Sequence, residues 1–397
     1  MREAVIVDVV RTASGRGKSG GALSGTHPVD LLSTVLEALV ARTGIDPATI
    51  DDVIGGCVQQ AAEQSTNLTR SAVLAAGFPE HIPATTIDRQ CGSSQQAATF
   101  AAQAIMSGFQ DIVIACGVES MSRVPMGIST LGKDFVGTKV HARYPEGLVN
   151  QGISAELIAA QWGFSRAELD EYSARSHALS AEAVANGLFD DEIVPVTVQG
   201  ADGEARTHLV DETVRAATTV DGLAGLSPSF RTDHYAERFP QIQWMITPGN
   251  SSPLTDGASA ALIMSAERAR ELGLKPRARF VSFSVVGDDP LLMLTGPIPA
   301  TRKVLGRANL SIDDIDAFEV NEAFAPVPLA WAKETGAPLD KLNPRGGAIA
   351  LGHALGSSGT RLLTTLVNHL EATGGRYGLQ TMCEGAGMAN ATIIERV

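Results

Sequence analysis

The sequence predicts an α/β protein built from two related halves with an inserted domain between them. Strand-like apolar runs alternate with helical patterns through most of the 397 residues, and such alternation favours open sheets of parallel strands covered by helices. The pattern also occurs twice along the chain, which indicates an internal repeat. Forty glycines in an alanine-rich background are typical of closely packed layers.

The first half begins with a β-branched strand over residues 2–10, and a second strand ends near Gly56 after a helical segment. A third strand at 84–88 leads into a helix over 95–106, and an apolar strand follows at 112–117. This strand–helix order is the unit that the rest of the chain repeats.

The second half follows the same order. A strand at 277–286 matches the first one, a strand at 315–320 again follows a helical segment, and a small-residue helix follows His353. The last apolar strand, at 379–385, again carries a cysteine and a glycine. Two related halves are expected to stack about a pseudo-two-fold axis, which would bring Cys91 and His353 together.

The repeat divides the chain into three segments. Residues 1–120 form the predicted N-terminal half, which about 251–270 complete, and residues 271–397 form the C-terminal half. Residues 121–250 do not fit the repeat and combine a polar, turn-rich stretch with helical patterns at 153–188. Long insertions often carry substrate-binding residues, so we interpret this segment as a loop domain.

Composition argues against several classes of partner. A net charge of −13 with only 5% aromatic residues disfavours nucleic acid and anionic membranes as the main partner. The sequence has no signal-peptide pattern and no apolar run long enough to span a bilayer, so a cytoplasmic protein is expected. In that compartment the four cysteines are expected to be reduced.

Cys91 is the first candidate for chemistry. It lies between the predicted strand at 84–88 and the predicted helix at 95–106. Free N–H groups and the positive end of a helix favour the thiolate, which is the nucleophilic form. A cysteine is more often a small buried core residue, so position alone leaves both interpretations open.

Three further motifs place polar groups among small residues. His353 lies in a glycine-rich stretch and can serve as a base for Cys91, although a loop-capping role is the alternative. Cys383 ends a strand and can move a proton at a bound acyl group, while Gly385 can offer its N–H to an oxyanion. Asn321 can hold a water for an oxyanion, although asparagine is more often a turn or capping residue.

Four ordered motifs resemble those of thiolases over essentially the whole chain. They are Arg-Gln-Cys-Gly-Ser-Ser, Asn-Glu-Ala-Phe-Ala, Gly-Gly-Ala-Ile-Ala-Leu-Gly-His and Cys-x-Gly. The resemblance implies the thiolase fold, with a five-layered α-β-α-β-α core and an inserted loop domain. It implies an acyltransferase of the 3-ketoacyl-CoA thiolase type, and the chain looks most like bacterial members that include actinobacterial forms of lipid or steroid breakdown.

The resemblance also implies roles for the motif residues. Cys91, deprotonated by His353, would attack the keto carbon of a 3-ketoacyl-CoA. Cys383 would protonate the departing acetyl-CoA carbanion and then activate the CoA that removes the acyl group. One oxyanion site would use His353 and a water on Asn321, and the other the N–H groups of Cys91 and Gly385. No metal or redox cofactor is implied, because coenzyme A is a substrate.

For coenzyme A the resemblance points mainly to the loop domain. Arg215 corresponds to an arginine near the adenine end of CoA, Phe230 to an aromatic of the CoA pocket and Ser252 to a serine on the pantetheine arm. A lone arginine or serine is otherwise an ordinary solvated residue. Thiolases are homodimers or homotetramers, and the tetramer forms through a loop that falls near 121–140 here.

Several positions depart from the usual thiolase pattern. Ala354 follows the histidine where the family usually has proline, and Ala386 stands where the family usually has glycine. Residues 150–152 are Asn-Gln-Gly in place of the His-Met-Gly of acetoacetyl-specific members, and the segment 231–246 is longer than usual. These departures suggest an acyl pocket unlike that of the short-chain biosynthetic enzyme.

Two alternatives to thiolytic cleavage of 3-ketoacyl-CoA are kept. A biosynthetic acetoacetyl-CoA thiolase would use the same site in the condensing direction. An acyl-CoA-binding protein without catalytic activity is the alternative from another class. Such a protein would be expected to lack a catalytic residue, whereas all four motif side chains are present.

Overall fold

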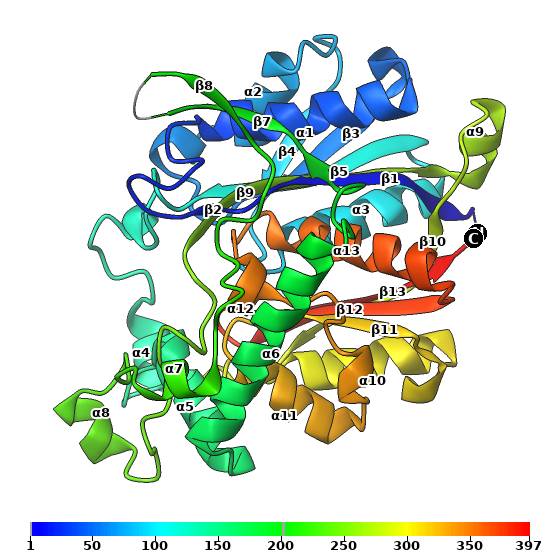
Figure 1. Cartoon of the computed structure of the whole chain (residues 1–397). Helices are drawn as coiled ribbons and strands as arrows, with labels where there is room; N and C mark the ends of the chain where they lie inside the picture. Colours follow the sequence, from blue (N-terminus) through cyan, green and yellow to red (C-terminus); the bar gives the residue numbers. More distant parts are fainter. Residues whose placement is uncertain (1, 201–202) are drawn as a thin grey trace.

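The computed structural model describes residues 2–200 and 203–397 as layers of helix and sheet (Figure 1). The central layer consists of α3 (Ser93–Ser107) and α13 (Ser358–Thr373), and a sheet lies on each side of it. The outer faces are covered by α1 (Pro28–Thr43) and α2 (Leu68–Ala75) in the first half and by α10 (Pro297–Ala308) and α11 (Pro326–Thr335) in the second. The five-layered core that the sequence predicts is confirmed.

Strand pairing follows the two halves of the sequence. The first half pairs in the order β1 (Ala4–Thr12), β9 (Thr255–Ser265), β5 (Ile112–Ser120), β3 (Asp52–Gly56) and β4 (Ala84–Ile87). The second half pairs in the order β11 (Ala317–Val320), β12 (Tyr377–Glu384), β13 (Met388–Arg396) and β10 (Ala278–Gly287). Among the described residues, the two sets join where Val5 pairs with Arg279 and Ile6 with Ala278.

The expectation of parallel strands was wrong for seven of the eleven strand pairs among the described residues, because each sheet is mixed. Strand β3 is parallel to β4 and β5, and β11 is parallel to β12. By contrast β9 is antiparallel to β1 and β5, and β13 is antiparallel to β10 and β12. A helical crossover gives a parallel pair, but β12 and β13 are joined by the short turn 385–387, which permits only an antiparallel one.

Small residues allow the two central helices to approach closely. A Cβ atom on Gly359 would lie 2.0 Å from the backbone N of Gln95, so α13 can pack on α3 only with glycine there. The Ser94 hydroxyl accepts a hydrogen bond from the N–H of Thr360 at 2.9 Å across the same contact. This contact places the start of α3, which follows Cys91, against the start of α13, which follows His353.

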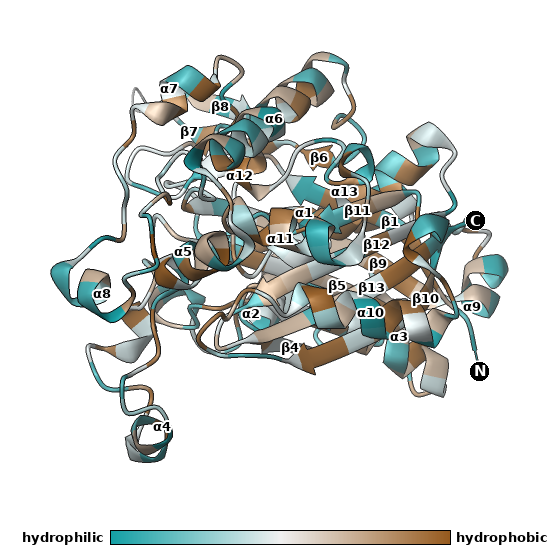
Figure 2. Ribbon diagram, turned by 90° about the horizontal axis from the view of Figure 1, so that it is seen from below, coloured by the Kyte–Doolittle hydropathy of each residue, from teal (hydrophilic) through white to brown (hydrophobic). Residues whose placement is uncertain are grey.

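The inserted segment forms a less regular unit along one side of the layers. Its helices are α4 (Thr138–Arg143), α5 (Gln151–Trp162), α6 (Arg166–Ala185), α7 (Val220–Ala224) and α8 (Asp233–Arg238). Two short strands follow α6: β6 (Ile193–Val194) pairs with β1, and β7 (Val196–Gln199) pairs with β8 (Ala205–His208). Figure 2 shows α4 and α8 standing away from the layered core.

Three further short elements are one strand and two helices. Strand β2 (Gly15–Arg16) pairs with β9, α9 (Ala266–Glu271) follows β9, and α12 (Ala348–Leu351) precedes His353. Across residues 2–200 and 203–397, no helix combines the length and the apolarity needed to cross a membrane.

Candidate active site

Cys91 lies in a tight turn between β4 and α3. Gln90 adopts the left-handed conformation with φ of 50°, and its N–H donates to Asp88 Oδ1 at 2.6 Å. Gly92 is the N-cap of α3, and a Cβ atom there would lie 2.2 Å from Glu384 Oε1. The turn therefore requires glycine after the thiol, and its positive-φ residue is of the kind that often marks functional turns.

The structure brings the four predicted catalytic side chains into one buried cluster. Cys91 and Cys383 are close enough for their charges to interact. The Asn321 side chain lies near enough to the Cys383 thiol to lower its pKa, and Asn321 Nδ2 lies 3.3 Å from His353 Nε2. All four side chains are at most 5% exposed. The contacts that connect Cys91 to His353 thus run through Cys383 and Asn321.

Hydrogen bonds define the tautomer of His353. Ser358 Oγ lies 2.6 Å from His353 Nδ1, and the same hydroxyl donates to the carbonyl of Ala354 at 2.8 Å. The hydroxyl proton is therefore already used, so Nδ1 carries the ring proton and donates to Ser358. This leaves the lone pair of Nε2 facing Asn321, on the side where a proton can be accepted.

Burial determines the protonation states of His353 and Cys91. It lowers the pKa of His353 to about 3, and the nearby Arg361 charge acts in the same direction. It raises the pKa of Cys91 to about 12, and the Glu384 charge adds to the rise while a hydrogen bond from Gln151 opposes it. The helix start was expected to favour the thiolate, but desolvation outweighs that effect and favours the thiol. At neutral pH the site holds a thiol and a neutral imidazole.

Gly385 lies at the start of the turn between β12 and β13 and is buried beside Gln90. A Cβ atom at Gly385 would lie 2.9 Å from Gln90 Oε1. The turn thus packs against the turn that carries Cys91. The exposed Ala386 that follows has a φ of 65°, a conformation that glycine adopts with less strain.

The predicted CoA residues do not all lie near this cluster. The Phe230 ring packs edge-on against Phe324 with 6.0 Å between ring centroids. The Ser252 hydroxyl donates to the Ala323 carbonyl at 3.1 Å. Both residues therefore adjoin the segment that carries Asn321. Arg215 is exposed, and its backbone N–H donates to His177 on α6 at 3.2 Å.

Glu384 is a site residue that sequence reasoning missed. It is 0% exposed, and neither carboxyl oxygen has a hydrogen-bond partner in the described part of the chain. Burial raises the pKa of Glu384 to about 8, which the Arg89 charge opposes and the Asp88 charge favours. The acid is next to Cys383 in sequence, but nothing in the sequence places it against Gly92.

Replacing this acid should stabilise the protein in alkaline solution. The folded-state pKa of about 8 lies above the ordinary 4.5, so wild-type stability falls as pH rises between these values, by up to about 1.4 kcal/mol per pH unit. Glu384→Gln cannot ionise and should escape that fall. Urea unfolding of both proteins from pH 4 to 9 measures the difference; a difference that does not grow with pH would contradict the assignment.

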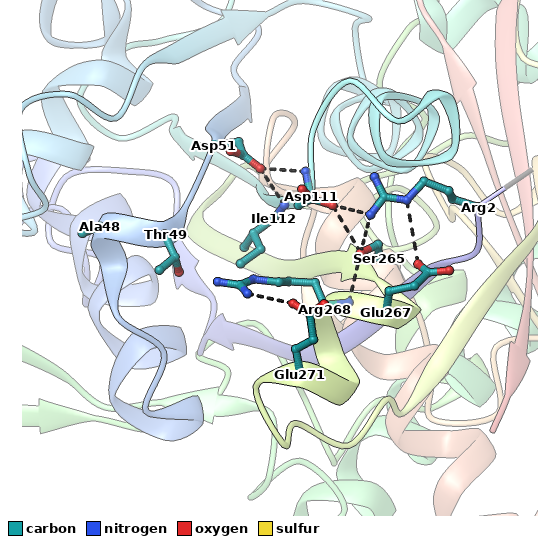
Figure 3. A pocket seen from close by; sticks show the side chains of 10 residues that line it. All are labelled: Arg2, Ala48, Thr49, Asp51, Asp111, Ile112, Ser265, Glu267, Arg268 and Glu271. Carbon is teal, nitrogen blue, oxygen red and sulfur yellow. Dashed lines mark hydrogen bonds and ion pairs between the residues drawn. The ribbon is translucent and has the colours of Figure 1, made fainter.

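Figure 3 shows a pocket of about 430 Å³ that is lined by Arg2, Asp111, Ser265, Arg268, Glu271 and five neighbours. Most of its charged side chains form ion pairs within the pocket. Arg2 contacts Asp111 and Glu267, and Arg268 contacts Glu271 at 2.9 Å. None of the lining residues belongs to the four motifs, so we do not assign the chemistry to this pocket.

Comparison with known proteins gives one consistent result. Residues 4–267 match the thiolase N-terminal domain and residues 274–396 match the thiolase C-terminal domain. The steroid 3-ketoacyl-CoA thiolase FadA6 of Mycobacterium tuberculosis is 48% identical over 406 aligned positions, which cover 100% of this chain and 95% of that protein. A 3-ketoacyl-CoA thiolase of Vibrio vulnificus is 46% identical with complete coverage of both chains.

A solved structure agrees with these sequence relatives. The crystal structure of the Bacillus anthracis acetyl-CoA acetyltransferase superposes with a TM-score of 0.90 at 38% identity. The alignment covers 100% of this chain and 99% of that one.

Proposed function

The chain belongs to the thiolase family, and on that premise we propose that it cleaves 3-ketoacyl-CoA with a second CoA into acetyl-CoA and a shortened acyl-CoA. It is an enzyme of the acyltransferase class. The observation that carries the proposal is the buried cluster of two thiols, an amide and a neutral imidazole. This set combines a nucleophile, a base and oxyanion donors in one place.

In the first step Cys91 Sγ bonds to the keto carbon of the substrate. Because burial keeps the thiol protonated, its proton must leave during the attack, and His353 Nε2 accepts it. The carbon–carbon bond then breaks, and its electron pair passes to the acetyl-CoA fragment. Cys383 donates its proton to that carbanion, which departs as acetyl-CoA.

In the second step the Cys383 thiolate takes the proton of an incoming CoA thiol. The CoA sulfur attacks the acyl–Cys91 thioester, and Cys91 leaves with the proton that His353 holds. The N–H groups of Cys91 and Gly385 are proposed to stabilise the tetrahedral oxyanion of the acyl group. Asn321, through a bound water, and His353 are proposed to stabilise the enolate oxygen of the acetyl-CoA fragment. No residue of the protein changes oxidation state, so coenzyme A as a substrate suffices.

Coenzyme A is proposed to reach this cluster along the inserted segment. Phe230 and Ser252 adjoin the Asn321 segment and are suited to contact the pantetheine arm. The exposed Arg215 is suited to pair with the phosphates or stack near the adenine. We propose domain boundaries at about residues 120, 250 and 270. The inserted segment between 120 and 250 would bind CoA, and the two halves would carry the catalytic residues.

The acyl group is proposed to be larger than acetyl. Gln151, whose side chain acts to lower the pKa of the Cys91 thiol, is the first residue of α5, and α5 packs in an apolar cluster with the segment that contains α8. The buried members of this cluster are Val149, Ile153, Leu157, Phe239 and Ile242. Tyr235 and Trp244 pack against the same cluster. We infer that this cluster borders the acyl site, where it would suit a fatty or ring-containing acyl chain, and one relative is named for a steroid substrate.

A chain-length profile tests this assignment. Each additional buried CH₂ should raise kcat/KM by up to about fourfold, the equivalent of about 0.8 kcal/mol. Thiolysis is followed as CoA-dependent loss of 3-ketoacyl-CoAs from four carbons upward. A strong preference for the four-carbon substrate would instead favour the biosynthetic acetoacetyl-CoA thiolase; the Bacillus structural relative is named an acetyl-CoA acetyltransferase.

The enzyme is proposed to be a cytoplasmic homodimer or homotetramer. Four free, buried cysteines suit a reducing compartment. Leu131 and Phe135, in the segment expected to join dimers, are 81% and 82% exposed, and such side chains are often covered in an assembly. Light scattering of the protein and of Phe135→Asp tests this: a tetramer that persists in the variant would exclude this segment as the contact.

A further inference from the structure

The carboxylate of Glu322 accepts four hydrogen bonds in the protein interior. Oε1 accepts from Tyr172 Oη and from Asn343 Nδ2, each at 2.8 Å. Oε2 accepts from Ser176 Oγ at 2.7 Å and from the N–H of Ile349 at 3.1 Å. The side chain is 0% exposed. A carboxylate can accept about four such bonds, whereas an amide in its place accepts fewer.

This carboxylate connects the two segments whose side chains meet in the active site. Glu322 directly follows Asn321, whose Nδ2 lies 3.3 Å from His353 Nε2. Its bond to the Ile349 N–H holds α12, which ends at Leu351, just before His353. One buried group therefore fixes the positions of both partners in the Asn321–His353 contact.

The glycine-rich segment before α12 is shaped around Glu322. A Cβ atom on Gly347 would lie 2.3 Å from Glu322 Cδ, so a larger residue would displace the carboxylate. The Gly347 N–H donates at 3.1 Å to Ser176 Oγ, the same hydroxyl that donates to Glu322. The lack of a side chain at Gly347 and the hydrogen bond of its N–H to Ser176 therefore both allow α12 to approach the Glu322 carboxylate closely.

Two of the four donors come from the inserted segment. Tyr172 and Ser176 lie four residues apart on α6 and therefore on one face of that helix. The carboxylate of Glu322 joins this face to the two catalytic segments of the C-terminal half. We propose that Glu322 is a positioning residue that, through α12, aligns His353 with Asn321. This rests on the base role proposed above for His353.

Glu322→Gln is the direct test. The glutamine side chain has one acceptor oxygen and one NH₂ group, and the NH₂ group would face two of the four donors. Depending on its orientation, either the Ile349 N–H or Asn343 Nδ2 then loses its acceptor. Because small misplacements of catalytic groups cost about 10²-fold, acyl transfer to Cys91 should slow by about that factor. The rate is measured in a single turnover with acyl-CoA by intact-protein mass spectrometry. KM should stay within about threefold, since Glu322 does not touch the proposed CoA residues.

A double-mutant cycle separates positioning from general destabilisation. In a His353→Ala background, Glu322→Gln should slow acyl transfer by less than about threefold, because its effect passes through the missing imidazole. An equal loss in both backgrounds, or no loss in the single variant, would overturn the proposal. Unchanged acyl transfer in His353→Ala alone would instead refute the base role, whatever Glu322 does.

A milder pair of variants covers the case in which Glu322→Gln does not fold. Ser176→Ala removes one donor to Glu322 and the acceptor of the Gly347 N–H, and it should slow acyl transfer by about tenfold, again only when His353 is present. Ser180→Ala is its matched control: this buried hydroxyl lies one turn further along α6 and donates to Arg345 O at 3.1 Å, not to Glu322. Equal effects of the two substitutions would overturn the proposal.

Discussion

Replacing Cys91 with serine should abolish the acyl-enzyme and lower thiolysis by at least about 10³-fold. The reason is the environment that burial creates around the nucleophile. A group whose pKa is raised to about 12 as a thiol would be still harder to deprotonate as a hydroxyl, and the neutral imidazole of His353 is a weak base for it. Intact-protein mass spectrometry after incubation with acyl-CoA measures the adduct directly.

Cys116→Ala is the matched control for this experiment. Cys116 is also a free, buried thiol, and burial also raises its pKa, but it lies within β5 and outside the four motifs. Its removal should leave the adduct on Cys91 intact. An adduct that survives in Cys91→Ser, or disappears in Cys116→Ala, would exclude Cys91 as the nucleophile.

Cys383→Ser should separate the two halves of the reaction. Burial raises the pKa of the Cys383 thiol well above its ordinary value, and the neighbouring Cys91 charge adds to the rise. A thiol can still protonate a carbanion and deprotonate CoA, whereas a hydroxyl is less acidic by several pH units. Thiolysis of 3-ketoacyl-CoA should therefore fall by about 10³-fold, the upper range for loss of general acid–base catalysis.

The same variant should still acquire an acyl group from an acyl-CoA thioester, at a rate within about tenfold of wild type. That reaction uses Cys91 and His353 and forms no carbanion. Mass spectrometry follows the adduct, and ultraviolet absorbance follows the loss of 3-ketoacyl-CoA. Full thiolysis activity in Cys383→Ser would remove this residue from the mechanism.

Local pattern predicted most of the layered fold, because helices and strands alternate with clear periodicity in both halves. Strand direction was harder to predict. The direction of β9 depends on a segment that returns to the first sheet after the whole insertion, and β13 depends on a turn only three residues long. The connecting segments set the directions of β9 and β13, and the alternation of apolar and polar residues within a strand does not reveal how those segments run.

The motif residues of the site were predicted, but their ionisation was not. The helix start suggested an acidic thiol, and only the folded chain encloses Cys91 with Leu362 and Met382 from the other half. Gln151 stood out in the sequence merely as a departure from the family pattern, yet its side chain acts to lower the pKa of the Cys91 thiol. The hydrogen bond between Tyr172 and Glu322 likewise could not be predicted from the sequence, because 150 residues separate the two and only the fold brings them together.

The division of the active site between two halves has a consequence for synthesis on the ribosome. Cys91 is made early, while His353 and Cys383 come near the end of the chain. At about 5–20 residues per second, His353 follows Cys91 by roughly 13–50 s. During that interval the thiol has no second half to enclose it, so nascent chains should be the form of this enzyme most sensitive to oxidants. Completion of the C-terminal half should confer chemical protection and activity at the same moment.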